Sequence, residues 1–169
     1  MTDLLYSDIE EELRRAVRSV LEDLAPWSQV LAGTETGDPC DAKLWRTIST
    51  DLGCAGLAVP EEFGGAGASF REAAVVLEEL GRAVAPVPFL GSAVLATAAM
   101  LEAGETELLT QLAAGRRIAA LAVPFSTPPG ADFPATVRAD GAAADSRPAA
   151  EPGGNTTLTG VVRSVADGL

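Results

Sequence analysis

The sequence predicts a mainly α-helical bundle followed by the first strands of a β domain, and three observations support this fold class. Two Ser-x-x-Glu motifs, which begin at Ser7 and Ser69, each precede apolar residues at helical spacing. After Gly115 the helical spacing stops, and residues 118–123 form a short apolar run typical of a buried strand. The chain has 169 residues, 47% of them hydrophobic, which is enough for a packed core.

The first helix is expected to begin at Ser7 and to end before Pro26, which cannot continue a helix. Its buried face is expected to carry Ile9, Leu13, Ala16, Val17, Val20 and Leu24. Two i,i+4 ion pairs are expected on this helix, Glu10–Arg14 and Glu11–Arg15. They are expected to lie on a solvated face of the helix rather than in a binding site.

Four further helices are expected, and together with the first they are expected to form a bundle in which most neighbouring helices are antiparallel. Glycines and a proline make residues 32–40 an expected loop, and a second helix spans 41–52. The third helix spans 69–80, where Gly81 is expected to end it. Its core face is expected to carry Phe70, Ala73, Val76, Leu77 and Leu80, whereas Glu72, Glu78, Glu79 and Arg82 face elsewhere. After an extended connection at Pro86 and Pro88, a nearly all-apolar fourth helix spans 90–101 and a short fifth spans 105–114.

Beyond residue 115 the pattern favours strands. Residues 118–123, 135–138 and 158–165 are strand-like, and most of residues 128–154 is rich in Pro, Gly, Ala and Asp, which is typical of loops. We therefore expect an all-α domain over residues 1–115 and the beginning of a β domain over 116–169.

Composition argues against several classes of function. The formal net charge is −12 and no basic cluster is present, so nucleic acid is not an expected partner. The apolar run 93–100 is too short to span a bilayer and no secretory signal is visible, so we expect a cytoplasmic protein without a membrane span. The chain has two cysteines, Cys40 and Cys54, and no histidine, so no metal site is expected. Both cysteines are interpreted as small hydrophobic residues.

A glycine-rich loop precedes the third helix, and two interpretations of it are open. A helix N-terminus after glycines can bind phosphate, but the spacing of Gly64, Gly65 and Gly67 matches no phosphate-binding motif, and Glu61 and Glu62 would repel an anion. The favoured alternative is a structural turn. In that case at least one of Gly64 and Gly65 is expected at positive φ, where a β-branched residue would be strained.

The chain resembles the acyl-CoA dehydrogenases, as an actinobacterial-type member. The resemblance rests on the order of the helices, the loop 59–67, the helix end Glu79-Leu80-Gly81-Arg82 and the change of pattern after Gly115. It implies the family's N-terminal all-α domain and the start of its middle β domain. Members oxidise acyl-CoA thioesters of fatty acid or steroid side-chain metabolism to trans-2-enoyl-CoA, with FAD as the hydride acceptor and a carboxylate as the base.

The resemblance also implies site residues. The family base lies in a C-terminal helical domain, so no catalytic residue is assigned here and the chain is expected to be inactive alone. Where the middle domain contacts the flavin, this sequence has Ser126 and Thr127, which become candidate FAD-binding residues, with a plain turn after a strand as the alternative. Phe89, Leu90 and Ala93 are candidate residues that line the acyl pocket, with an ordinary core position as the alternative.

The sequence and the resemblance leave three possible functions for this chain. The chain is the N-terminal part of a flavin-dependent acyl-CoA dehydrogenase, with acyl-CoA as substrate. Alternatively, it is a non-catalytic subunit that assembles with a complete acyl-CoA dehydrogenase protomer, a homo- or hetero-oligomer being expected in either case. A free-standing helical adaptor explains the helices but leaves the strand-like segments unexplained.

Overall fold

The computed structural model describes residues 5–37, 40–128, 130–131, 136–140 and 157–168. The described chain divides into two compact units. The first contains the residues up to Leu121 together with Asp167 and Gly168, and the second contains residues between Ala122 and Ala166.

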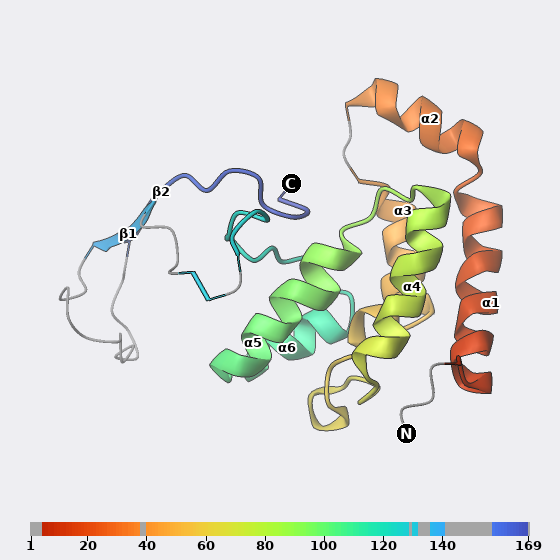
Figure 1. The fold of residues 1–169 in the computed structure, drawn as a ribbon, viewed down its shortest axis with the longest axis horizontal. Coiled ribbons are helices and arrows are strands. Elements are labelled where there is room, and N and C mark those ends of the chain that lie inside the picture. Colours follow the sequence, from red (N-terminus) through yellow and green to blue (C-terminus); the bar gives the residue numbers. More distant parts are fainter. Residues whose placement is uncertain (1–4, 38–39, 129, 132–135, 141–156, 169) are drawn as a thin grey trace. The chain divides into compact units, whose positions relative to one another are not determined.

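The first unit is helical, which confirms the predicted fold class for this part of the chain (Figure 1). Its α-helices are α1 (Asp8–Leu24), α2 (Trp27–Thr36), α3 (Ala42–Arg46), α4 (Phe70–Ala83), α5 (Thr97–Ala103) and α6 (Thr106–Ala113). Two π-helices extend this set: η1 (Thr47–Asp51) continues α3, and η4 (Phe89–Ala96) leads into α5. Two short 3₁₀ turns are η2 (Cys54–Gly56) and η3 (Glu61–Phe63).

Both predicted helix starts are confirmed as capping boxes. The Ser7 hydroxyl accepts a hydrogen bond from the Glu10 backbone N–H, and the Glu10 carboxylate accepts one from the Ser7 N–H at 2.6 Å. Ser69 and Glu72 repeat this arrangement at the start of α4, where the Ser69 N–H donates to the Glu72 carboxylate at 2.9 Å. These contacts satisfy N–H groups that the first helical turn leaves without partners, so they define where each helix begins.

Helices α1 and α4 lie side by side and run in the same direction, which corrects the expectation of an antiparallel arrangement (Figure 1). Ion pairs along the contact keep the same order on both helices: Glu10–Arg71, Arg14–Glu78, Arg14–Glu79, Arg18–Glu79 and Glu22–Arg82. The chain reaches this arrangement because α2, α3 and the glycine loop return it to the starting end before α4 begins. Glu10 and Glu79 are therefore buried in the contact rather than solvated, and Glu79 is only 1% exposed.

Other helix boundaries also differ from the expectations. The predicted loop 32–40 is partly helical, since α2 extends to Thr36. Helix α4 passes through Gly81, which was expected to end it, and ends at Ala83, after which Val84 takes the left-handed conformation. Phe70 and Ile9, predicted to face the core, are 57% and 73% exposed, so these two predictions are wrong.

The core of the first unit joins α1, α3, α4 and η4. Its centre contains the fully buried side chains of Leu21, Leu44, Ile48, Val76 and Phe89. These residues come from α1, α3, η1, α4 and η4. Val76 stands at a predicted core position, whereas Leu21 lies outside the predicted buried face of the first helix and Phe89 precedes the predicted fourth helix, so the helical spacing identified only part of the core.

The second unit contains a two-stranded antiparallel sheet of β1 (Val137–Asp140) and β2 (Thr157–Gly160). Val137 pairs with Gly160 and Asp140 pairs with Thr157, so the strands are in full register. Strand β2 confirms the start of the predicted segment 158–165, and Pro124 and Val165 form a further single bridge. Residues 118–123 are not a strand, because no described strand pairs with them. Most of the predicted loop 128–154 lies outside the described residues.

None of the described helices is both long enough and apolar enough to cross a lipid bilayer.

Candidate functional site

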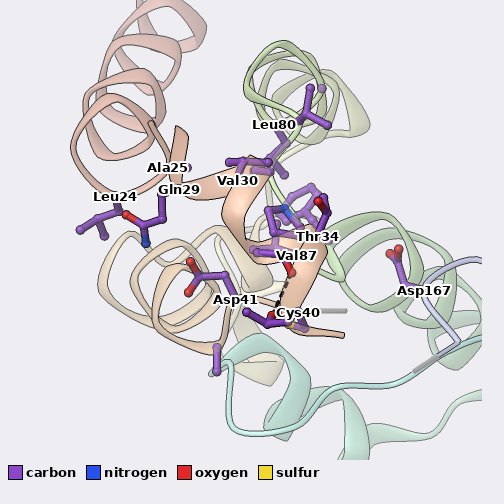
Figure 2. Close-up of a pocket in the computed structure, with 18 of the residues that line it drawn as sticks. Leu24, Ala25, Gln29, Val30, Thr34, Cys40, Asp41, Leu80, Val87 and Asp167 are labelled. Atoms are coloured by element: carbon purple, nitrogen blue, oxygen red, sulfur yellow. Dashed lines mark hydrogen bonds between the residues drawn. The ribbon is translucent and has the colours of Figure 1, made fainter. Parts of the chain in front are cut away.

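A cavity of about 1110 Å³ lies in the first unit, between the end of α1, α2, the end of α4 and the segment 85–90 (Figure 2). Its apolar lining includes Leu24, Val30, Leu80, Val87, Phe89 and Leu90. A cavity of this size and lining suits an apolar part of a small molecule.

Helix α2 covers one side of this cavity, and it begins directly after Pro26, which ends α1. Gln29, Val30, Gly33 and Thr34 recur at helical spacing and line the cavity, whereas Trp27 and Leu31 are 77% and 57% exposed. No residue of α2 is buried. These lining residues were not predicted, because no element was expected over residues 27–31 and the glycines in the segment 32–40 suggested a loop. The spacing of residues 29, 30, 33 and 34 is nevertheless the signal of a helix face.

Two carboxylates line the cavity, and its described lining contains no lysine or arginine. Asp41 caps α3 by accepting a hydrogen bond from the Leu44 N–H at 2.9 Å, and its own N–H donates to the Pro86 carbonyl at 2.9 Å. Asp167 accepts a hydrogen bond from the Gly91 N–H at 2.6 Å. The cavity is therefore apolar with an acidic rim, which disfavours an anionic ligand group.

The three candidate substrate residues divide between the cavity and the core. Phe89 and Leu90 belong to the cavity lining, although Phe89 is only 1% exposed. Ala93, one turn later in η4, packs in the hydrophobic core and is absent from the cavity lining. Contact of any of the three with a substrate stays a prediction.

The two candidate flavin residues belong to the second unit, in a turn that follows Pro124. The Thr127 N–H donates to the Pro124 carbonyl at 2.9 Å, and the Phe125 N–H donates to the Ser164 carbonyl at 2.8 Å. The Ser126 side chain is exposed and that of Thr127 is half-buried, and within the described residues neither hydroxyl makes a hydrogen bond. A role of either hydroxyl in FAD binding stays a prediction.

The glycine loop before α4 has the geometry of a structural turn. The N–H groups of Ala66, Gly67 and Ala68 donate to chain carbonyls at 2.8–2.9 Å, so they are not available to a phosphate. Gly64 has φ +82°, and a Cβ on Gly65 would overlap the carbonyl of Val59. The expectation of a positive φ at one of these two glycines is confirmed at Gly64.

A buried ion-pair cluster, formed by Glu79 with Arg14, Arg18 and Arg82, connects α1 to α4. Hydrogen bonds from Arg18, and then from Arg14 and Arg82, lower the pKa of Glu79 to about 2 against the opposing effect of burial. The carboxylate is consequently ionised at neutral pH and fully engaged, which suits helix pairing and not proton transfer.

The cysteines and acidic residues that the structure describes show no arrangement for metal binding. Within the described part of the chain, no group of three or more His, Cys, Asp or Glu residues lies close enough to hold a metal ion. Burial raises the pKa of the Cys54 thiol to about 12, so this side chain behaves as a small hydrophobic residue at neutral pH.

Comparison with known proteins agrees with this architecture. The family model for "Acyl-CoA dehydrogenase, N-terminal domain" matches residues 7–115. Acyl-CoA dehydrogenase IpdE2 of Mycolicibacterium smegmatis is 46% identical over 112 residues, which cover 66% of this chain and 36% of that protein. IpdE2 of Mycobacterium tuberculosis is 41% identical over 111 residues, which cover 64% of this chain and 35% of that protein.

Two solved structures share the fold. The "Tcur3481-Tcur3483 steroid ACAD G363A variant" has a TM-score of 0.62 at 36% identity and covers 69% of this chain and 33% of its own. The ChsE4-ChsE5 complex from Mycobacterium tuberculosis has a TM-score of 0.66 at 24% identity and covers 82% of this chain and 37% of its own. The chain spans about a third of the length of the curated relatives it matches. Because the family model covers most of the chain, this chain belongs to the acyl-CoA dehydrogenase family and contains its N-terminal helical domain.

Proposed function

We propose that this chain provides the N-terminal helical domain of a flavin-dependent acyl-CoA dehydrogenase, which converts an acyl-CoA thioester to the trans-2-enoyl-CoA. Family membership supports the reaction class. The cavity beside Phe89 and Leu90 is the observation that carries the substrate side of the proposal, since its apolar walls suit an acyl group.

The charges of the cavity indicate which end of the substrate it takes. Asp41 and Asp167 would repel the phosphates of CoA, and no cationic side chain lines the described cavity to attract them. The uncharged acyl end therefore enters the cavity, and the CoA nucleotide lies elsewhere.

The reaction needs a hydride acceptor and a base, and two pairs of described residues are considered for these roles: Ser126 and Thr127 for holding the acceptor, and Asp41 and Asp167 for the base. FAD, when bound, supplies the hydride acceptor, and the exposed Ser126 and half-buried Thr127 hydroxyls are proposed to hydrogen-bond it. Asp41 and Asp167 already accept hydrogen bonds from backbone N–H groups, so neither is proposed as the base that removes the α-proton.

A steroid-derived acyl group is the proposed substrate class, with fatty acyl groups as the alternative. The solved structure that is 36% identical to this chain is that of a "steroid ACAD" variant. A cavity of about 1110 Å³ has room for fused rings. A cytoplasmic location is proposed with this activity.

The second candidate function is a non-catalytic subunit of a heteromeric acyl-CoA dehydrogenase. Phe125 is 67% exposed. By the family resemblance it stands near the position where the middle domain usually has an acid, and this difference favours a chain that does not complete a flavin site by itself. In this case the other chain of the complex holds the flavin.

Purification from the native host, with a tag at Met1, tests both functions. The preparation is examined for a flavin absorption spectrum and for dye reduction with straight-chain and steroid side-chain acyl-CoAs. Flavin together with turnover supports an acyl-CoA dehydrogenase, and a preparation that has neither contradicts it. Separation of co-purifying chains by gel filtration in mild denaturant then shows whether the flavin follows the tagged chain or its partner.

A further inference from the structure

Asp167 contributes to the cavity from the far end of the described chain. All other described lining residues come from positions 24–90, whereas Asp167 lies 76 positions after Gly91, whose backbone N–H donates to its carboxylate at 2.6 Å. Figure 2 shows Asp167 on the side of the cavity away from Leu24 and Ala25. The contact therefore connects a distant segment to the start of η4.

The backbone N–H of Gly91 depends on the Asp167 carboxylate for its hydrogen bond. It belongs to the first turn of η4, where backbone N–H groups have no acceptor within the helix, and Gly91 is buried. A negative charge is also favoured at a helix start, and a hydrogen bond to a carboxylate is stronger than one between neutral groups. Asp167 thus stabilises this particular backbone conformation.

The turn that Asp167 holds presents the cavity wall. Phe89 and Leu90 directly precede Gly91, and both line the cavity. Ser92, which follows Gly91, is held separately, because its hydroxyl accepts a hydrogen bond from the Ala119 N–H at 3.1 Å. The segment is also π-helical, a wider and rarer turn that is frequent at functional sites.

We propose that Asp167 is a positioning residue that sets the shape of the acyl-binding cavity by holding the start of η4. The proposal rests on the proposed function, in which this cavity receives the acyl group. Asp167 does not touch the reacting atoms; its effect reaches the substrate through Leu90 and Phe89.

The backbone of Asp167 determines which variants test this. Asp167 has φ +50°, a conformation that asparagine and glycine tolerate and alanine does not. Asp167→Asn keeps an acceptor oxygen for the Gly91 N–H, whereas Asp167→Gly removes the acceptor without adding backbone strain. Asp23→Asn is the matched control, because Asp23 is exposed on α1 and outside the cavity lining. If Asp167→Gly is partly unfolded at the assay temperature, both measurements are repeated at a lower temperature at which it is folded.

The test uses the protein purified with its co-purifying chains and two measurements. In steady-state kinetics with the preferred acyl-CoA, Asp167→Gly should raise KM about tenfold and change kcat by less than about twofold, since it disturbs binding and not chemistry. In hydrogen exchange, the amides of residues 89–96 should exchange at least about tenfold faster in Asp167→Gly. Asp167→Asn and Asp23→Asn should stay close to the unmodified protein in both measurements.

Unchanged exchange in Asp167→Gly, an unchanged KM in a protein that turns over, or equal defects in Asp167→Asn and Asp167→Gly would each overturn the proposal. Absence of turnover in the unmodified protein overturns the proposed function instead. The exchange measurement then still decides whether Asp167 holds this wall of the cavity.

Discussion

The guanidinium of Arg18 donates two hydrogen bonds to the carboxylate of Glu79, at 2.9 and 2.7 Å, although 61 positions separate the two residues. The Glu79 side chain is 2% exposed, whereas that of Arg18 is 41% exposed. Arg14 and Arg82 complete the cluster around the same carboxylate, each at 3.0 Å. A single buried acid of α4 thus binds two arginines of α1 and one of its own helix, and this contact is a specific target for mutation.

Glu79→Gln should lower the free energy of unfolding by about 1–3 kcal/mol, because a neutral amide removes the charge that three guanidinium groups share, although Arg14 keeps Glu78 and Arg82 keeps Glu22. The cost stays below that of a fully buried pair, since Arg18 and Arg82 are half-exposed and regain water. Glu78→Gln is the matched control on the same helix, where the side chain is 50% exposed, and should cost less than about 1 kcal/mol. Urea unfolding followed by circular dichroism measures both, and equal effects would contradict a special role for Glu79.

Stability should fall on acidification between about pH 4.5 and about pH 2. The folded pKa of Glu79, about 2, lies below its ordinary value of 4.5, so the unfolded chain binds more protons than the folded one in this interval. The stabilisation is complete above the ordinary pKa and is lost as pH falls through the folded pKa. Glu10, whose pKa Arg71 lowers to about 2, acts in the same direction. Unfolding midpoints measured from pH 2 to 7 should show a smaller slope in Glu79→Gln, and an identical slope would refute the assignment.

Three glycine-to-alanine variants should separate backbone strain from steric overlap. Gly64→Ala should cost about 1–2 kcal/mol, because a Cβ at φ +82° is strained even though space is open around it. Gly65→Ala should cost more, about 3 kcal/mol, because the new methyl group would overlap the Val59 carbonyl. Gly81→Ala, in the interior of α4 with open space, should stabilise by about 0.5–1 kcal/mol. Thermal melts rank the three, and any other order would show that the loop adjusts.

A charge placed in the cavity should weaken substrate binding. Leu90→Asp adds a third carboxylate to the lining and should raise KM for the preferred acyl-CoA at least about tenfold. Leu31→Asp is the control, because Leu31 is 57% exposed on the outer side of α2 and should leave KM unchanged. The assay is dye reduction by the protein purified with its partners, and equal KM values for the two variants would mean that the acyl group binds elsewhere.

The 169-residue chain produced by itself should show no acyl-CoA dehydrogenase turnover and little tight FAD binding. Both carboxylates in the described cavity lining are held by backbone N–H groups, so neither is placed to remove an α-proton. Dye reduction with a panel of acyl-CoAs and added FAD measures this. Clear turnover by the chain alone would show that a carboxylate within residues 1–169 acts as the base.

The sequence by itself determined where most helices begin and which face of each is apolar. Capping boxes at Ser7 and Ser69 and the spacing of apolar residues act within one or two helical turns, so they can be read from neighbouring positions. Phe89 and Leu90, which line the cavity, were named through the family resemblance and not through these local signals.

Only the tertiary structure decided how these elements combine. The parallel pairing of α1 and α4, the burial of Glu79 and the bond between Asp167 and Gly91 connect residues 61 to 76 positions apart. A solvated Glu and a buried, ion-paired Glu have the same local sequence pattern, because the difference lies in the arginines that a distant helix brings to it. The cavity likewise exists only where α2, α4 and the segment 85–90 come together, so its acidic rim and apolar walls follow from long-range packing, which local sequence patterns do not specify.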